Sequence, residues 1–326
     1  MVDSFGRSIN YLRISVTDRC NFRCRYCMPE EGVQNLEHGK ILSLEDYTRL
    51  ARVAARVGIS KIRLTGGEPL VRKNITRLVE CLADIDGIDD IAMTTNGLLF
   101  PALAQELKAA GLKRVNISLD TLKEERFAYI TRRGGLSSVL QAISKALELG
   151  MDPVKINVVA IRGFNDDEIG DLARLAYDHP LHIRFIEFMP VGDLLFWEPE
   201  RMIPSDEIRM ELQNYYELSP EKTVEGNGPA RYYKISGGAG SIGFISPMSH
   251  QFCSECNRIR LTADGKLRGC LYEKQEVDLK QALERKASDE ELQALFQSGI
   301  MSKPAHHDMD SGWGRHNFRK MYQIGG

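Results

Sequence analysis

Three cysteines lie within eight residues near the start of the chain, in the pattern C-x3-C-x2-C, at Cys20, Cys24 and Cys27. Thiolates at this spacing can bind one metal centre from a single loop. A structural zinc site is normally closed by four ligands, so three thiols leave such a site one ligand short. Iron–sulfur clusters are also held by cysteine thiolates. The spacing therefore predicts a [4Fe–4S] cluster with one iron open to a small molecule, and the alternative is a zinc knuckle.

A second set of three cysteines lies towards the other end of the chain, at Cys253, Cys256 and Cys270. Their spacing, C-x2-C-x13-C, again lacks a fourth cysteine. The chain has seven cysteines, and an odd, clustered set without a signal peptide favours metal binding over disulfides. This triplet therefore predicts a second metal centre. A zinc site that the nearby His250 completes stays open as an alternative to a cluster.

Two arginines, Arg258 and Arg260, follow the second triplet's C-x2-C. Side chains one residue apart on an extended segment point to the same side. Because a guanidinium matches phosphate oxygens in a bidentate way, the pair could hold a triphosphate beside a cluster. The alternative is that both are exposed strand charges.

The elements that must position these residues are strands and helices in regular alternation. Six strand-like segments alternate with helical ones, and such alternation favours parallel strands joined by right-handed helical crossovers. Six units are too few to close an eight-fold barrel, so we expect an α/β fold with an incomplete (βα)6, TIM-like partial barrel and a smaller C-terminal domain. The predicted strands are 11–16, 61–64, 90–94, 114–119, 154–159 and 182–188, and the predicted helices are 44–57, 74–84, 101–110, 123–129, 136–149 and 166–177.

Length and composition set the outer limits of this interpretation. A chain of 326 residues exceeds the size at which single cores usually stop growing, so we predict domains at 1–226 and 227–326, divided at a Gly-rich loop. A net charge of −2 gives no reason to expect a nucleic acid or an anionic membrane as partner. The chain has no apolar run long enough to span a bilayer and no apolar signal core, so we expect a cytoplasmic protein.

Four basic residues lie inside the predicted strands, at Arg13, Arg63, Lys155 and Arg184. A strand buried on both faces should be almost wholly apolar, so these cations need a counter-charge. One explanation is an internal salt bridge, for instance to Glu187. Four cations in one barrel instead favour a polyanionic ligand.

The first cysteine loop resembles the signature of the radical S-adenosylmethionine (SAM) superfamily, with Tyr26 as the aromatic residue before the last cysteine. The turn at residues 66–69, Gly-Gly-Glu-Pro, resembles the second signature of that superfamily. The resemblance implies a [4Fe–4S] cluster on the first triplet that binds SAM. It also implies that Tyr26, Gly67, Ser118 and Met189 line the SAM pocket.

The joint pattern of both triplets, the R-x-R pair, the segment 261–265 and a terminal Gly-Gly resembles the GTP 3′,8-cyclase family of molybdenum-cofactor biosynthesis. That resemblance implies a lyase that converts GTP to (8S)-3′,8-cyclo-7,8-dihydroguanosine 5′-triphosphate, with a second [4Fe–4S] cluster that binds the guanine. It implies that the Gly-Gly tail enters the active site, so that Gly325, Gly326 and Arg13 are the expected catalytic residues. The residues it implies for GTP are Arg13, Arg63, Thr94, Lys155, Arg184, Arg258 and Arg260.

The resemblance also implies partners. These are cyclic pyranopterin monophosphate synthase as the downstream enzyme and a reductant such as flavodoxin or ferredoxin. The sequence leaves open whether the chain forms a homodimer. Two other functions stay open: a different radical SAM enzyme with an auxiliary cluster, which would usually carry more C-terminal cysteines, and a non-catalytic zinc-binding module.

Two further patterns suggest chemistry that we do not expect. Residues 238–243 satisfy G-x-G-x-x-G but lie between two strand-like segments, so we predict a hairpin turn and no dinucleotide site. His306 and His307 could suggest a metal site, but the flanking Lys303-Pro304 and 312–314 predict a loop with solvated histidines.

Overall fold

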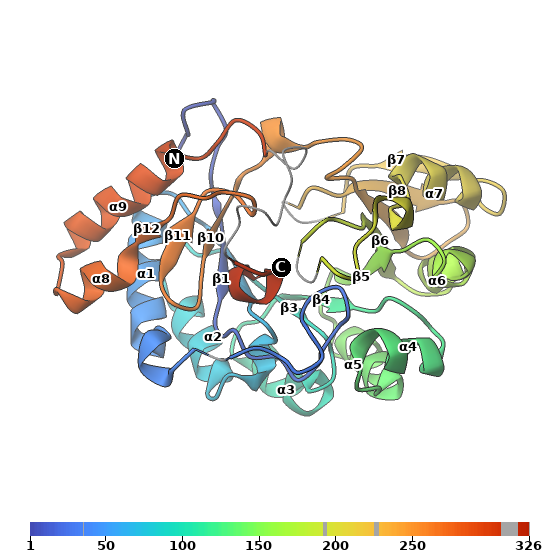
Figure 1. Cartoon of the computed structure of the whole chain (residues 1–326), viewed down its shortest axis with the longest axis horizontal. Coiled ribbons are helices and arrows are strands. Elements are labelled where there is room, and N and C mark those ends of the chain that lie inside the picture. Colours follow the sequence, from blue (N-terminus) through green and yellow to red (C-terminus); the bar gives the residue numbers. More distant parts are fainter. Residues whose placement is uncertain (35, 192–193, 225–227, 308–318, 326) are drawn as a thin grey trace.

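A computed structural model covers the chain and describes all residues except 35, 192–193, 225–227, 308–318 and 326. Its central feature is a twelve-stranded sheet whose middle six strands run parallel and lie in chain order. The sheet curls into an open arc (Figure 1). The predicted partial barrel is therefore confirmed, and each predicted strand is correct to within one residue at each end. The six strands are β1 (Tyr11–Ser15), β2 (Lys61–Thr65), β3 (Asp90–Thr95), β4 (Arg114–Ser118), β5 (Val154–Ala160) and β6 (Leu181–Glu187).

Helices cover the outer face of this arc, as Figure 1 shows. The first of them begins at Ser43, whose side chain accepts a hydrogen bond from the backbone N–H of Asp46, while the Asp46 carboxylate accepts one from the backbone N–H of Ser43. This reciprocal cap satisfies N–H groups that a helix start leaves without partners. The covering helices are α1 (Leu44–Arg56), α2 (Ile75–Ala83), α3 (Phe100–Ala109), α4 (Glu124–Thr131), α5 (Leu136–Glu148) and α6 (Ile169–Asp178).

The main core lies between the sheet and these helices. Leu12 and Ile14 of β1 are fully buried in it together with Leu50 and Val53 of α1. Side chains alternate between the two faces of a strand, so Arg13 points away from this core and into the barrel. The same alternation directs the polar residues of the other strands to the barrel interior.

The C-terminal part of the chain extends the same sheet at both ends. β10 (Arg258–Leu261) lies parallel to β1, and β9 (Ser241–Ile245) lies parallel to β6. β8 (Arg231–Ile235) and β9 form an antiparallel hairpin. Residues 238–240 of the Gly-rich run lie in its turn, as predicted, whereas 241–243 already belong to β9. The domain division at residue 226 stays a prediction. The remaining strands are β7 (Leu218–Glu221), β11 (Lys266–Arg268) and β12 (Val277–Asp278).

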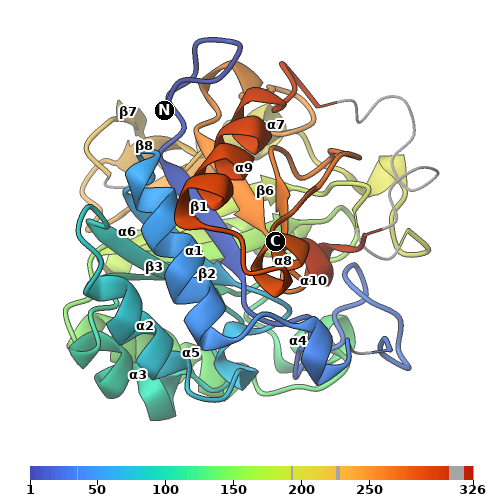
Figure 2. The same cartoon turned by 90° about the vertical axis from the view of Figure 1, so that its left-hand side faces the viewer.

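Four further helices complete the described structure: α7 (Ser205–Leu212), α8 (Leu279–Glu284), α9 (Asp289–Met301) and α10 (Met321–Ile324). α9 lies beside α1 (Figure 2), where Arg49 Nε donates to Asp289 Oδ1 at 2.9 Å. The short α10 lies in the opening of the arc, near the C-terminal end of the chain in Figure 1. Among the described residues, no helix combines the length and the apolar character needed to cross a bilayer.

Candidate active site

The first cysteine triplet lies on the loop after β1, where Cys20, Cys24 and Cys27 line a cavity of about 1030 Å³. None of the three thiols is in a disulfide. The loop is held by backbone hydrogen bonds to the end of α4, including Arg23 N–H to the carbonyl of Thr131 at 3.0 Å. Burial, with the nearby charge of Glu68, raises the pKa of Cys20 to about 11. Protein thiols with such pKa values bind a metal by exchanging a proton for it.

The Gly-Gly turn after β2 packs directly against this loop. The N–H of Gly67 donates to the carbonyl of Thr17 at 2.8 Å, and the N–H of Glu68 donates to the carbonyl of Arg19 at 2.8 Å. A Cβ on Gly67 would lie 2.4 Å from that Arg19 oxygen. The turn therefore needs glycine here because the two backbones approach too closely for a side chain.

All four residues that the resemblance implies for SAM line the same cavity as the first triplet: Tyr26, Gly67, Ser118 and Met189. The hydroxyl of Tyr26 donates to Asp120 Oδ2 at 2.7 Å, which orients the ring at the cavity wall. Burial raises the pKa of Asp120 to about 6 although this hydrogen bond lowers it. The cavity has the three thiols, the close backbone approach and a mostly apolar wall with a few polar groups such as Asn96 and Asp120, an arrangement that suits a cluster and SAM.

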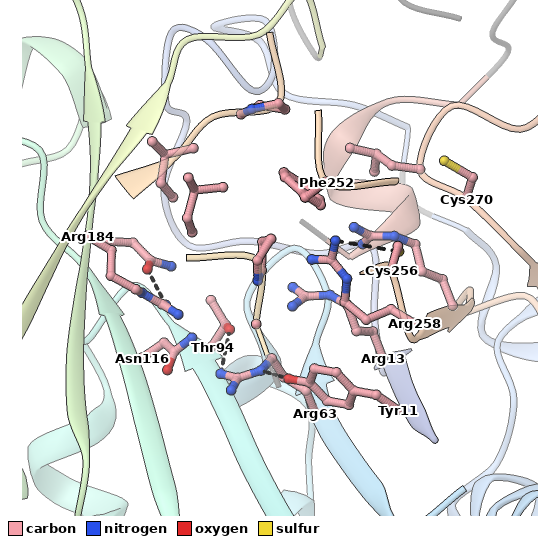
Figure 3. Close-up of a pocket in the computed structure, with 18 of the residues that line it drawn as sticks. Tyr11, Arg13, Arg63, Thr94, Asn116, Arg184, Phe252, Cys256, Arg258 and Cys270 are labelled. Atoms are coloured by element: carbon pink, nitrogen blue, oxygen red, sulfur yellow. Dashed lines mark hydrogen bonds between the residues drawn. The ribbon is translucent and has the colours of Figure 1, made fainter. Parts of the chain in front are cut away.

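The second triplet lines a neighbouring cavity of about 1160 Å³. In Figure 3, Arg184 and Asn116 face Arg13, Arg258 and Cys256 across this cavity. Every basic residue that the sequence singled out for GTP contributes to its wall, and one further arginine does so too. The seven basic side chains are Arg13, Arg63, Arg114, Lys155, Arg184, Arg258 and Arg260.

Strand pairing brings three of these arginines together in one row. Arg13 on β1 is paired with Arg260 on β10 and with Arg63 on β2, so the three guanidiniums extend from adjacent positions of the same face. Arg63 also donates to the phenol of Tyr11 and, at 3.3 Å, to Thr94 Oγ1. The predicted R-x-R pair is thus confirmed on a strand that joins the barrel sheet, with both side chains at the cavity.

The charge of this cavity is strongly one-sided. No Asp or Glu belongs to the described residues that line it. Burial, reinforced by the charges of Arg184, Arg114 and Arg63, lowers the pKa of Lys155 to about 6. Within the part of the chain that the structure describes, Arg184 Nε and Asn116 Oδ1 are buried without a hydrogen-bond partner. Buried polar groups normally have partners, so Arg184 Nε indicates a ligand with an acceptor, such as an anion, and Asn116 Oδ1 indicates a ligand with a donor, such as a hydroxyl or an amine.

The two cavities adjoin and share part of their walls. Residues Thr94, Asn157, Ile186 and Met189 line both of them. Gly325 contacts one residue of each cavity. Its carbonyl accepts a hydrogen bond from Arg260, which lines the cavity of the second triplet. A Cβ on Gly325 would lie 2.2 Å from Oγ1 of Thr65, which lines the cavity of the first triplet. The two thiol triplets therefore face adjoining cavities that share one wall.

The spacing of the thiols bears on the type of metal centre. Across the described residues, no three His, Cys, Asp or Glu side chains converge on one point where a single ion could bind. A [4Fe–4S] cluster places each thiolate on a different iron, so its ligands lie farther apart than those of one ion. The cluster ligand sets of both triplets stay predictions.

Comparison with known proteins identifies the family. Residues 14–176 match the model of the radical SAM superfamily, and residues 181–309 match that of Molybdenum Cofactor Synthesis C. A GTP 3′,8-cyclase from Syntrophomonas wolfei is 64% identical over 326 residues, with 100% of both chains covered. One from Moorella thermoacetica is 57% identical over the same span, again with 100% of both chains covered. The chain belongs to the GTP 3′,8-cyclase family.

Solved structures support the fold of this GTP 3′,8-cyclase family member. Streptococcus suis SuiB bound to S-adenosylmethionine has a TM-score of 0.63 at 14% identity, covering 89% of this chain and 68% of that chain. Methylornithine synthase (PylB) has a TM-score of 0.50 at 17% identity, covering 64% of this chain and 62% of that chain. At such identities the likeness shows the fold alone, which is the partial barrel described above.

The structure corrects one prediction about this family member and limits another. His307 is buried, not solvated: its Nε2 donates to the carbonyl of Pro247 at 3.1 Å, its ring lies 5.4 Å from that of Tyr272, and it lines the cationic cavity. The expectation fails because these partners come from distant segments that the local loop pattern does not reveal. His306 is exposed, as predicted. Gly326, the last expected catalytic residue, lies outside the described residues.

The structure also adds residues that the sequence analysis did not single out for the GTP 3′,8-cyclase site. His250, the alternative zinc ligand for the second triplet, is not among these residues and does not line the cavity. Its Nε2 instead forms a hydrogen bond with Asp206 Oδ2 at 2.7 Å. Arg114 and Asn116 do line the cavity, from alternate positions of β4. The sequence carries a signal for both, because they are polar residues in a strand that should be apolar, but Arg114 is the first residue of its strand, where an exposed charge is equally compatible with the pattern.

Proposed function

We propose that this chain is a radical SAM lyase that converts GTP to (8S)-3′,8-cyclo-7,8-dihydroguanosine 5′-triphosphate in the first step of molybdenum-cofactor biosynthesis. One observation carries the proposal. The two thiol triplets open on adjoining cavities, and the wall of the second has seven basic side chains, of which Arg114 is paired with a carboxylate in the described structure, that of Asp90 outside the wall. A triphosphate supplies the negative charge that this wall needs, and GTP is the molecule on which the named relatives act.

We assign one iron–sulfur cluster to each of the two cavities. We assign Cys20, Cys24 and Cys27 to the first [4Fe–4S] cluster, which when bound would supply the electron that cleaves SAM to a 5′-deoxyadenosyl radical. The wall around it would orient SAM, with the backbone of Gly67 at its polar end. We assign the second cluster, which would anchor the guanine base, to the other triplet. The SAM residues are Tyr26, Gly67, Ser118 and Met189, and the second triplet is Cys253, Cys256 and Cys270.

The basic row would hold the triphosphate of GTP. Arginine matches phosphate oxygens in a bidentate way, and a buried row of guanidiniums loses its mutual repulsion when an anion enters. The residues assigned to GTP are Arg13, Arg63, Thr94, Lys155, Arg184, Arg258 and Arg260, and Arg114 joins them on the present geometry.

The shared wall would bring the reacting groups together. Thr94 and Met189 line both cavities, so a ribose held above them would meet the adenosyl group of SAM. A primary radical attacks almost any C–H bond, so the substrate must be held in close contact and water excluded. Met321 and Tyr322 of α10 help to close the SAM cavity, and the tail places the backbone of Gly325 against Arg260. Arg13, Gly325 and Gly326 are our candidates for direct catalytic contact.

The same proposal covers the partners. The product would pass to cyclic pyranopterin monophosphate synthase, and a low-potential reductant such as flavodoxin or ferredoxin would supply the electron. We expect this chemistry to take place in the cytoplasm. A homodimer remains one assembly state to be measured.

Anaerobic enzymology tests the function. The purified, reconstituted protein should contain about eight irons per chain, at four per cluster. With GTP, SAM and dithionite it should form 5′-deoxyadenosine and a cyclised GTP in equal amounts, and omission of GTP should abolish the second product. Replacing either whole triplet by alanine should remove about four irons and all turnover. A protein that holds zinc and no iron would contradict the proposal.

A further inference from the structure

A buried lysine lies against the second cysteine triplet. Lys303 is 2% exposed and is not among the residues that line the cavity of that triplet. Its ammonium donates to Cys256 Sγ at 3.3 Å, to the carbonyl of Gly269 at 2.6 Å and to the carbonyl of Arg258 at 3.0 Å. The three donors of the ammonium are thereby satisfied.

Only one of these three acceptors can carry a negative charge, and it is the sulfur of Cys256. A buried ammonium is costly unless an opposite charge lies close to it. The carboxylate of the nearby Glu273 accepts hydrogen bonds from the N–H groups of Gly269 and Cys270, and the charge of Lys303 also acts on it. A thiolate at Cys256, with the negative cluster bound to it, is therefore the counter-charge in direct contact with the ammonium.

The N-terminal arm holds the lysine in this position. The buried Arg7 donates to the carbonyl of Cys253 at 2.9 Å, and to the carbonyls of Pro304 and Ala305 at 2.8 and 3.1 Å. Arg7 is itself held by Asp3, whose Oδ2 accepts from Arg7 Nε at 2.6 Å. One guanidinium thus ties the segment that follows Lys303 to the first cysteine of the triplet, so the ammonium and the thiols form one rigid unit.

We propose that Lys303 is the charge partner of the second cluster and raises its reduction potential. The inference rests on the proposed function, in which this triplet holds a [4Fe–4S] cluster. Net charge, hydrogen bonds to the sulfurs and solvent exposure set the potentials of such clusters. A fixed positive charge at one thiolate favours the reduced state, which carries one more negative charge. Arg258 also contacts Cys256 Sγ, at 3.6 Å, but it lines the substrate cavity, so replacing it would change GTP binding as well. Lys303 does not line that cavity, so its replacement tests the effect on the cluster alone.

The test uses the full chain with Cys20, Cys24 and Cys27 replaced by alanine, which leaves only the second cluster. In this background we compare Lys303→Met, Lys303→Arg and Lys274→Met. Lys274 is an exposed lysine close to Cys270 in the sequence, so it controls for a change of one charge near the cluster. The readouts are iron per chain and the midpoint potential from a redox titration followed by electron paramagnetic resonance.

Lys303→Met should lower the midpoint potential, by about 59 mV if the ratio of reduced to oxidised cluster changes tenfold. Lys303→Arg should restore most of the potential, and Lys274→Met should leave it unchanged. Loss of iron from Lys303→Met alone, with an unchanged unfolding temperature, would also support a required charge. Loss of iron from both Lys303 variants, or full iron with an unmoved potential, would overturn the inference. A parent protein that binds no iron would instead refute the second cluster and the proposed function with it.

Discussion

Arg13 on β1 and Arg260 on β10 are directly paired in parallel register, although they lie near opposite ends of the chain. Like charges opposite each other destabilise a sheet. Burial lowers the pKa of Arg13 well below its usual value, and the charges of Arg260 and Arg63 lower it further. The pairing therefore costs the ligand-free protein stability, and an anion between the strands would reverse that cost.

Arg13→Met should have opposite effects on stability and on binding. Replacing a buried charge by an apolar side chain of similar volume should raise the free energy of unfolding of the ligand-free protein by about 1 kcal/mol. Loss of a charge-assisted contact should weaken GTP binding by roughly tenfold to hundredfold. Denaturant unfolding and calorimetry measure the two effects. Arg162→Met, which removes an exposed arginine paired with Glu207, is the control and should change neither. A less stable Arg13 variant with normal GTP affinity would contradict the ligand-free repulsion argued here.

Arg258→Ala and Arg260→Ala should weaken GTP binding, each by roughly tenfold or more, because both line the cationic cavity and neither lines the SAM cavity. SAM binding, measured separately by calorimetry, should stay within about twofold of the parent protein. If both ligands were lost to the same extent, the fold or a cluster would have failed and these arginines would have no specific role with GTP.

GTP binding should be accompanied by proton uptake near pH 8. Burial lowers the pKa of Lys155 from 10.5 to about 6, so the amine of the ligand-free protein is neutral at that pH. A triphosphate beside it would raise the pKa again, and about one proton would be taken up. Calorimetry in two buffers of different ionisation enthalpy measures the uptake. Lys155→Met should abolish it, and an equal uptake in the variant would assign the proton to another group.

The lowered pKa of Lys155 also determines how the stability of the ligand-free protein changes with pH. Between pH 6 and 10.5 the unfolded chain binds a proton at Lys155 that the folded, ligand-free chain does not. The contribution of Lys155 to the free energy of unfolding therefore rises with pH across this window and is least favourable below pH 6. Lys155→Met should flatten the pH profile in this window. A profile that stays as steep in the variant would show that Lys155 is not its source.

Gly67→Ala should destabilise the protein and impair SAM binding, because its Cβ would lie 2.4 Å from the carbonyl oxygen of Arg19 and 2.8 Å from that of Asp18. Backbone cannot move aside as a flexible side chain can, so we expect a loss of about 2 kcal/mol or more. Gly170→Ala is the matched control, since nothing lies within 4 Å of a Cβ there and the residue is in α6. That change should raise stability by about 0.5–1 kcal/mol. Equal effects of the two substitutions on the unfolding temperature would refute the close approach.

Arg319→Gln should loosen the C-terminal tail. The guanidinium of Arg319 binds Asp264 Oδ1 and Oδ2 at 3.0 and 2.8 Å and also binds the carboxylate of Glu276, just before α10 begins. The uncharged amide has two N–H donors in place of the five of the guanidinium, and it loses the ion pairs. Trypsin should then cut after Lys320 several-fold faster, measured as release of peptide 321–326. Arg285→Gln, which removes an exposed charge before α9, should leave the rate unchanged. No increase in the Arg319 variant would mean that other contacts hold the tail.

The sequence by itself determined the local elements and much of the list of chemically active side chains. The six strand–helix units follow from hydrophobic periodicity, and Ser43 is recognisable as a cap from its neighbours alone. The alternation of side chains places Arg13, Arg63, Lys155 and Arg184 on one face of their strands, which is why charges in apolar strands pointed correctly to one interior cavity.

Only the tertiary structure decided which segments become neighbours. The pattern of 258–261 predicts an extended segment, but such a segment could form backbone hydrogen bonds with either edge of the sheet. The fold places it beside β1. Arg260 therefore lies beside Arg13. The burial of His307 and of Lys303 depends likewise on partners far away in the sequence, at Pro247 and at Cys256. Periodicity is a local property and encodes the type of element, whereas burial and charge pairing arise only when distant elements pack together.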